Sequence, residues 1–266
     1  MAQPKTHVVK ASNRKWLITA LRLLIISLFF LCWELAARTG RLDTFFFSSP
    51  GEIAKDLSVL FITGKIIPHL LRTMAEVFAG LGLGTLSGIA TGIVLGRNEL
   101  LARILDPVIM GLYAIPKIAI APLFILWFGL GILGKIVFAW IVVFFLIFFN
   151  TYAGMRAVDK ELLHTVQAMG ATPWQLLVKV SIPSCMPWIM VGLRASLGAS
   201  LIAAIVGEFV AADTGLGHLI MEGLTLFMTQ RVLAVVLILS VIVIAMDLGL
   251  RYLQRRFMAW NNGRLD

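Results

Sequence analysis

Six long apolar stretches separated by short charged segments constrain the fold of this chain more than any other feature. A run of about 20 apolar residues is long enough to cross a bilayer as an α-helix. Of the 266 residues, 59% are hydrophobic and only 14% are charged, far more apolar than a soluble domain of this size requires. The sequence therefore predicts an all-α polytopic membrane protein with transmembrane helices at residues 16–37, 71–95, 104–129, 136–152, 188–211 and 232–252.

The basic residues between these stretches orient the predicted bundle, because cytoplasmic loops are enriched in Lys and Arg. Thirteen lie on the side of the two termini: Lys5, Lys10, Arg14, Lys15, Arg97, Arg103, Arg156, Lys160, Lys179, Arg251, Arg255, Arg256 and Arg264. Seven lie on the other side: Arg38, Arg41, Lys55, Lys65, Arg72, Lys135 and Arg231. We expect cytoplasmic N- and C-termini. The net charge of +9 is scattered over loops, which argues against a nucleic-acid surface.

A polar segment, residues 156–187, separates the fourth and fifth stretches and begins with the pattern of a short helix. Asp159 is placed to cap its N-terminus, and Gly170 is placed to end it in a left-handed conformation. Four apolar residues recur at helical spacing and share one face of this predicted helix: Leu162, Leu163, Val166 and Met169.

A second short helix is predicted directly after Gly170. Thr172 supplies the N-cap, Pro173 the first helical residue and Gln175 the capping-box partner. Pro183 and Pro187 are expected to end it before the next transmembrane stretch. Two helices joined at a glycine, in water between two membrane spans, are well suited to contact a partner protein.

This segment resembles the EAA loop of the inner-membrane permeases of ATP-binding-cassette (ABC) importers. Ala168-Met169-Gly170-Ala171 and Val180-Ser181-Ile182-Pro183 carry the likeness, and the spacing from Gly170 to Pro183 matches the family pattern. The pattern's glutamate falls at His164, and its two alanines at Thr165 and Val166, so the acidic start is missing. The secure half of the match runs from the glycine to the proline.

The resemblance extends over residues 65–257 and is closest to the nitrate/sulfonate/taurine group, on Ile115-Pro116 to Ala121-Pro122-Leu123 and on Leu126-Trp127-Phe128-Gly129. It implies a type I, MetI-like bundle. Three domains are expected. Residues 1–64 would form an N-terminal tail, the first transmembrane helix and an external amphipathic segment. Residues 65–257 would form the transmembrane domain, with the coupling loop at 156–187, and residues 258–266 a cytoplasmic C-terminal tail.

The same resemblance implies a role and partners. The chain would be the inner-membrane permease, a homodimer that imports a small anion delivered by an external solute-binding protein. ATP hydrolysis would occur on two cytoplasmic ATP-binding subunits, so the chain itself would need no cofactor. The residues implied to couple the chain to these subunits are Ala168, Met169, Gly170, Ala171, Thr172 and Trp174.

Two features of the transmembrane stretches suggest roles independently of the resemblance, one in helix packing and one in a transport path. Gly80, Gly84, Gly88 and Gly92 recur every four residues and predict close packing against another helix. In residues 104–129, Pro116 and Pro122 are expected to break the helix within the span. Lys117 lies beside the first break, near the middle of the span.

An ionisable residue at that depth is a candidate for a transport path. The predicted path combines Pro116 and Lys117 with Ser196, Ser200 and Glu208. Two alternatives remain open for Lys117, which are extension to the headgroups and pairing with Glu76 or Glu208.

Two other segments have structural interpretations. Ser49-Pro50-Gly51-Glu52 begins a helix whose apolar residues Ile53, Leu57, Leu60 and Phe61 favour a position on the membrane surface. Residues 129–135 match the GxxxxGK core of a phosphate-binding loop, but Ile136 follows the lysine and no α/β context surrounds it, so a nucleotide site is rejected.

No metal-ligand spacing or nucleophile motif occurs, and the histidines (His7, His69, His164 and His218) are dispersed. The competing class is a self-contained secondary transporter or channel, which often shows inverted repeats and several central ionisable residues. A membrane-bound enzyme is a third class.

Overall fold

The computed structural model describes residues 11–210 and 212–257, and every regular element in this part is helical. Residues 1–10 of the predicted basic tail and the predicted tail 258–266 lie outside it. The elements are α1 (Ala11–Arg38), α2 (Thr44–Phe47), α3 (Pro50–Ile62), α4 (Ile66–Arg97), α5 (Glu99–Ala114), the 3₁₀-helix η1 (Lys117–Ile120), α6 (Ala121–Phe128), α7 (Ile132–Arg156), α8 (Lys160–Ala168), α9 (Pro173–Leu176), the π-helix η2 (Leu177–Ser181), α10 (Ile182–Val210), α11 (Leu216–Thr225) and α12 (Thr229–Phe257).

Five segments in the described part of the chain are long and apolar enough to cross a membrane: Trp16–Arg38, Ile66–Arg97, Ile132–Arg156, Pro173–Val210 and Thr229–Arg255. A sixth is formed by Glu99–Ala114 and Lys117–Phe128, which are bent by 75° relative to each other. The bend lies at Ile115 and Pro116, and Pro116 is the first of the two prolines predicted to break the third helix. Counting this pair as one span gives the six that the sequence predicts.

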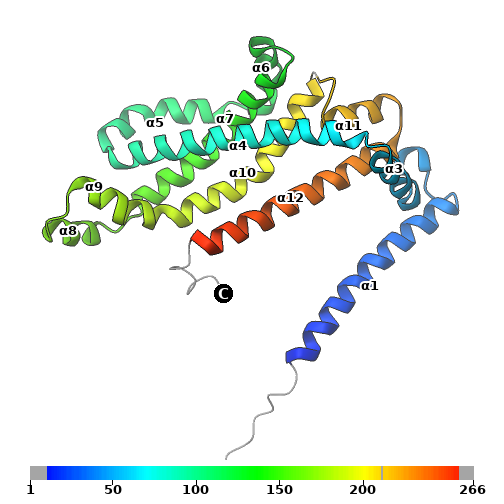
Figure 1. Cartoon of the computed structure of the whole chain (residues 1–266), viewed down its shortest axis with the longest axis horizontal. Coiled ribbons are helices and arrows are strands. Elements are labelled where there is room, and N and C mark those ends of the chain that lie inside the picture. The colour runs from blue at the N-terminus through cyan, green and yellow to red at the C-terminus, as the bar shows by residue number, and fades with distance from the viewer. Residues whose placement is uncertain (1–10, 211, 258–266) are drawn as a thin grey trace, which may run out of the picture.

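Helices α4, α7 and α10 form the centre of the bundle (Figure 1). The predicted glycine stripe of α4 faces α7, and a Cβ on Gly80 would lie 2.5 Å from the Cβ of Ala139. A Cβ on Gly84 would lie 2.5 Å from the Val143 side chain, and one on Gly92 would lie 2.7 Å from Thr151. The absence of side chains therefore lets the two backbones approach closely along most of their length.

The two prolines expected to end the second helix of the loop do not end it. Pro183 and Pro187 lie inside α10, which continues η2 and α9 into a single 38-residue span beginning at Pro173. A helix tolerates prolines where local π adjustments satisfy the freed backbone groups, and η2 is such an adjustment. The helix that contains this span therefore begins well before residue 188, the predicted start of the span.

Helix α3 begins as predicted, with the Ser49 side chain accepting a hydrogen bond from Glu52 N at 3.2 Å. Its apolar face, however, covers protein. Ile53 and Leu60 are buried, and Leu60 belongs to a cluster with residues of α10, α11 and α12. Arg231 of α12 clamps the helix by donating two hydrogen bonds to Asp56, at 2.7 and 2.9 Å. The prediction of a helix lying on the membrane surface is replaced by one packed onto the bundle.

Helix α1 extends away from the other helices (Figure 1). None of the residues in its most apolar 18-residue window is buried. Its C-terminal end is joined to α3, because Glu34 accepts a hydrogen bond from Gly51 N at 2.9 Å.

Candidate functional site

The segment between α7 and α10 has the local structure that its sequence predicts. Asp159 caps α8, accepting a hydrogen bond from Glu161 N at 2.8 Å. Gly170 has a φ of 87°, in the left-handed region that favours glycine. Thr172 and Gln175 form a capping box at the start of α9. Two short helices joined at a glycine therefore project from one end of the bundle (Figure 1).

Most apolar side chains of this segment are exposed in the described part of the chain, although Leu163 and Val166 of α8 are half-buried. Helix α8 contributes no buried residue, and the side chain of Met169 is 81% exposed. Trp174 is 68% exposed, and Ala168 and Thr172 are exposed as well. Ala171 is half-buried. Exposed apolar side chains at a membrane protein's aqueous end are a feature of protein-binding surfaces.

Lys117 lies at the bend between α5 and α6, on the wall of a cavity of about 550 Å³. Pro116 and Tyr113 line the same cavity, and α7 and α10 contribute apolar side chains to it: Phe138, Val142, Ala199, Ile202 and Ala203. Lys117 is half-buried there, directly after the break at which α5 ends at Ala114 and the chain changes direction before η1 begins.

Among the described residues, no carboxylate forms an ion pair with the ammonium group of Lys117. Its Nζ donates a hydrogen bond to the Tyr113 carbonyl oxygen at 2.9 Å. The same Nζ lies 4.3 Å from the centre of the Tyr113 ring and 4.8 Å from that of Phe145, which are cation–π distances. The alternative pairing with Glu76 or Glu208 is wrong, since both carboxylates have other partners.

The remaining residues of the predicted path do not line this cavity. Ser196 and Ser200 are fully buried within α10, and the Ser200 hydroxyl donates to the Leu197 carbonyl oxygen at 2.9 Å. Glu208 is 1% exposed and lies near the far end of α10. The structure therefore brings Pro116 and Lys117 together, apart from the other three, whose place in a path stays a prediction.

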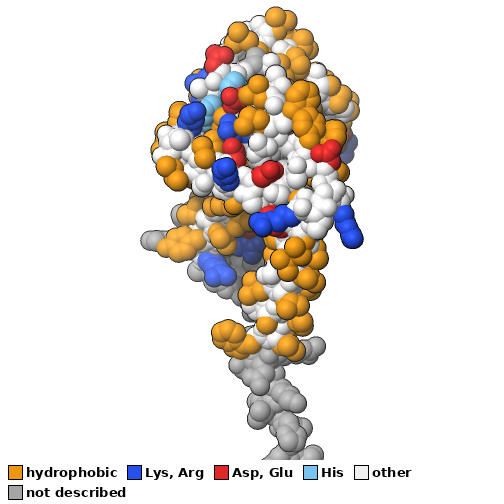
Figure 2. Space-filling view, turned by 90° about the vertical axis from the view of Figure 1, so that its right-hand side faces the viewer, with side chains coloured by type: hydrophobic (Ala, Val, Ile, Leu, Met, Phe, Trp, Pro, Cys, Tyr) orange, Lys and Arg blue, Asp and Glu red, His pale blue; other side chains and the backbone are white. Residues whose placement is uncertain are grey.

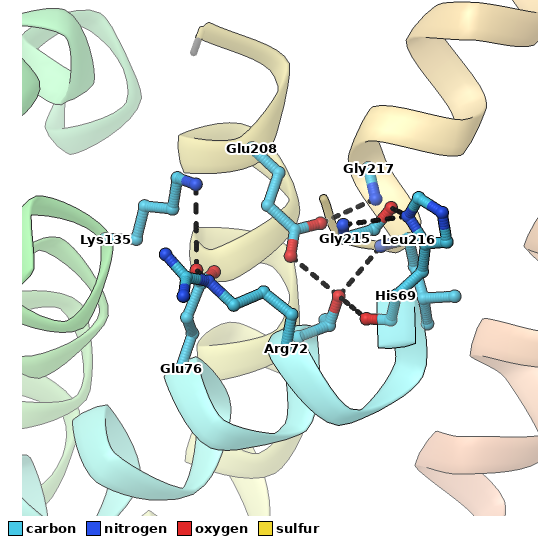
Figure 3. A network of polar contacts seen from close by, with 9 residues as sticks. His69, Arg72, Glu76, Lys135, Glu208, Gly215, Leu216 and Gly217 are labelled. Carbon is cyan, nitrogen blue, oxygen red and sulfur yellow. Dashed lines mark hydrogen bonds and ion pairs between the residues drawn. The ribbon is translucent and has the colours of Figure 1, made fainter. Parts of the chain in front are cut away.

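Glu208 belongs to a buried network of charged and polar groups that the sequence does not predict (Figure 3). Its two carboxylate oxygens accept hydrogen bonds from the Thr73 hydroxyl and from Gly217 N, each at 2.6 Å. Glu76, with no exposed surface, accepts from Arg72 Nε at 3.1 Å and lies 3.7 Å from Lys135 Nζ. Helices α4, α7, α10 and α11 all meet through these contacts.

The start of α11 is attached to α4 by the same network (Figure 3). Leu216 N donates to the Thr73 hydroxyl oxygen at 2.8 Å, and Gly215 N donates to His69 Nδ1 at 3.0 Å. Gly215 has a φ of 136°, and a Cβ there would collide with the Glu208 carboxylate. The turn before α11 thus requires a glycine for both its conformation and its space. Figure 2 shows this end of the molecule, where acidic, basic and histidine side chains are interspersed.

Lys135 does not lie where the sequence predicts it. It was expected in an external loop, but it lies in the first turn of α7 with 2% of its surface exposed. Its ammonium group faces Glu76, in keeping with the rejection of a phosphate-binding loop at residues 129–135. The sequence contains one indication of this pairing, because ionisable residues within apolar stretches usually pair with one another.

Comparison of the whole chain with known proteins identifies its family. The model of the binding-protein-dependent transport system inner membrane component matches residues 80–259. The chain is 29% identical over 97% of its length to a putative aliphatic sulfonates transport permease of Bacillus subtilis, of which it covers 95%. It is 29% identical over 86% of its length to the taurine transport system permease of Escherichia coli, of which it covers 85%.

A third relative is the formylaminopyrimidine transport permease of Halalkalibacterium halodurans, 34% identical over 88% of this chain and 94% of the relative. Among solved structures, an inward-facing form of the MetNI methionine ABC transporter matches with a TM-score of 0.64 at 20% identity, covering 72% of this chain and 95% of that one. That likeness shows the fold. Because the family model matches well over half of the chain, the chain belongs to the inner-membrane components of binding-protein-dependent transport systems, the permeases of ABC importers.

Proposed function

We propose that this permease forms the translocation path for a small organic anion of the sulfonate or taurine kind. The observation that carries the proposal is Lys117, a cation without a carboxylate partner on the wall of a cavity beside a broken helix. An intramembrane cation is costly, by roughly 3 kcal/mol on insertion scales, so its retention favours a function. A passing sulfonate or carboxylate would neutralise it. The names of the Bacillus subtilis and Escherichia coli relatives favour the same class of cargo.

The partners proposed are a second copy of the permease, two ATP-binding subunits and a solute-binding protein. The ATP-binding subunits would hold the segment from Ala168 to Trp174, whose apolar side chains are exposed. His164, where the family pattern has glutamate, is exposed on α8, so the acidic contact of the pattern is absent at that position. The binding protein would deliver its cargo at the opposite end of the bundle, where α3 and α11 lie.

This arrangement requires both termini and the α8–α9 segment to be cytoplasmic. A cysteine introduced at Thr172 tests it, because Thr172 is exposed in the middle of the segment. We expect an impermeant thiol reagent to label Thr172→Cys in inside-out vesicles and to leave it unlabelled in intact cells. Labelling from outside in intact cells would reverse the proposed topology.

Deletion of the chain followed by uptake measurements tests the proposed cargo. We expect uptake of radiolabelled aliphatic sulfonates or taurine to fall in the deletion strain and to return with the wild-type chain. Equal uptake in both strains would refute this cargo class. Purification of the tagged chain separates the importer from a secondary transporter: an ATP-binding subunit should copurify, whereas uptake into liposomes by the chain alone would favour the alternative.

A further inference from the structure

A second cavity, of about 430 Å³, lies between the α8–α9 segment and the neighbouring ends of α4 and α7. Three cations from three helices line it: Arg97, the last residue of α4; Arg156, the last residue of α7; and Lys160, the first residue of α8. This is the opposite end of the bundle from the buried network of Glu76 and Glu208, and neither the cargo nor the partners proposed above account for it.

Among the described residues, the three cations of this cavity form no direct ion pair, although the Glu99 carboxylate attracts Arg156 and Lys160 from a greater distance and Asp106 attracts Arg156. Arg97 donates a hydrogen bond to the Pro173 carbonyl oxygen at 3.4 Å, and Arg156 donates to the Tyr152 hydroxyl at 2.8 Å, so both are oriented by neutral groups. Lys160 has no ion pair in this part of the chain. Glu99, the one carboxylate in the lining, pairs with Arg103 at 2.8 Å.

The rest of the lining is partly apolar. Leu95 and Met155 are buried beneath the cations, at 7% and 6% exposure, and Val158 and Leu163 contribute further apolar surface. Because Arg97 and Arg156 are the last residues of α4 and α7, two segments long and apolar enough to cross a membrane, the cavity lies at the depth expected for lipid headgroups. Three cations next to buried apolar side chains complement a phosphate group that is esterified to a glycerol backbone. The cations would contact the phosphate, and the apolar side chains would contact the less polar part of the lipid. Basic pockets at the cytoplasmic ends of membrane helices are known to hold such headgroups.

We propose that this cavity binds the phosphate group of an anionic phospholipid through Arg97, Arg156 and Lys160. A bound headgroup would join α8 to the ends of α4 and α7, which matters because α8 has no buried residue of its own. The apolar side chains beside the cations favour a lipid over free phosphate as the source of the group. One consequence rests on the proposed function: if α8 and α9 couple the permease to its ATP-binding subunits, the headgroup would fix their position.

Binding is tested on the full chain in detergent, without any measurement of transport. Phosphatidylglycerol, phosphatidylcholine and inorganic phosphate are titrated separately, and the shift in thermal unfolding temperature reports occupancy. We expect stabilisation by phosphatidylglycerol and little by the other two. Arg156→Gln and Lys160→Gln should each weaken apparent phosphatidylglycerol affinity roughly fivefold, since one basic residue near a membrane surface contributes about that factor.

Lys179→Gln is the matched control, because Lys179 is an exposed lysine in η2 that does not line the cavity. Its phosphatidylglycerol affinity should equal that of the wild type. An equal loss in the control would show general surface attraction and overturn the site. Equal stabilisation by both lipids would overturn recognition of an anionic headgroup, and equal stabilisation by inorganic phosphate would overturn the lipid as the source. Because no transport is measured, these outcomes are independent of whether the proposed importer function holds.

Discussion

Lys135 and Lys117 both lie within the helical bundle, but their surroundings differ in nearly every respect. Lys135 is 2% exposed and faces Glu76 at 3.7 Å, where α4 and α7 pack closely. Lys117 lines a cavity at a break between two helices, and its partners are a backbone carbonyl oxygen and two aromatic rings. The first lysine is paired with a carboxylate of the protein, whereas the second has no carboxylate partner among the described residues.

The same contrast separates two regions of the molecule. The closed region consists of the glycines of α4 and the buried network, which hold α4, α7, α10 and α11 together. We therefore expect its residues to determine the stability of the folded chain. In the open region, the bend at Pro116 and the α8–α9 segment leave charged or apolar side chains uncovered, and we propose that its residues act in transport. Substitutions in the closed region should therefore lower stability, whereas those in the open region should lower transport in a protein that still folds.

The largest effect on stability is expected for Lys135→Met. Removing the ammonium group leaves the buried Glu76 carboxylate with only Arg72, beside the Glu208 network. Breaking a buried ion pair typically costs about 3–5 kcal/mol. We expect a large fall in yield and in thermal unfolding temperature in detergent.

The double variant Lys135→Met with Glu76→Gln separates charge from packing. It removes both charges, so we expect it to recover much of the stability that the single variant loses. Wild-type stability in the single variant would show that Lys135 and Lys117 do not differ in the way proposed here.

The next effect is expected for Gly84→Leu in the seam between α4 and α7. Even a Cβ at this position would lie 2.5 Å from Val143 and 2.9 Å from the Trp140 carbonyl oxygen. Overpacking of this kind typically costs about 1–3 kcal/mol. Gly82→Leu is the matched control, because nothing lies within 4 Å of a Cβ at Gly82. Equal unfolding temperatures for the two variants would mean that the seam tolerates separation.

A smaller global effect is expected for Gly170→Val in the open region. Its φ of 87° is strained for a β-branched residue, at a cost of about 1–3 kcal/mol confined to an exposed turn. We expect the variant to insert and purify normally but to lose cargo uptake and stimulation of the ATP-binding subunit. Gly170→Asn, which tolerates the left-handed conformation, should retain both activities. Normal uptake by the valine variant would remove this turn from coupling.

The open region was the easier one to predict from sequence. Helix caps and the glycine turn depend on residues within a few positions, so Asp159, Gly170 and Thr172 suffice to define the α8–α9 segment. Helical periodicity likewise places the glycines of α4 on one stripe.

The closed region, apart from its glycine stripe, depends on contacts between distant residues, and those contacts were not predicted. Glu76 and Lys135 are 59 positions apart, and nothing local indicates that they meet. The apolar face of α3 has the same pattern whether lipid or α12 covers it. Pro183 and Pro187 were expected to end a helix because their effect was judged locally, whereas η2 accommodates them within a long span.

The smallest effect on stability, together with a large effect on transport, is expected for Lys117→Met. The ammonium group has no carboxylate to leave unpaired, so its loss removes only one hydrogen bond and the contacts with Tyr113 and Phe145. Such cation–π contacts contribute about 1 kcal/mol or less when exposed, and the variant should therefore unfold near the wild-type temperature. Uptake of the anionic cargo should fall by about tenfold or more, because a hydrogen bond to a charged group contributes about 1.5–3 kcal/mol.

Lys117→Arg keeps the charge in the same place and is the matched control, so it should retain more uptake than Lys117→Met at equal expression. Unfolding temperature, ATP-binding-subunit copurification and uptake are measured together for both variants. Wild-type uptake by Lys117→Met would show that the cavity carries cargo without this cation. A marked fall in its unfolding temperature would instead assign Lys117 a structural role like that of Lys135, and the contrast between the two lysines would then disappear.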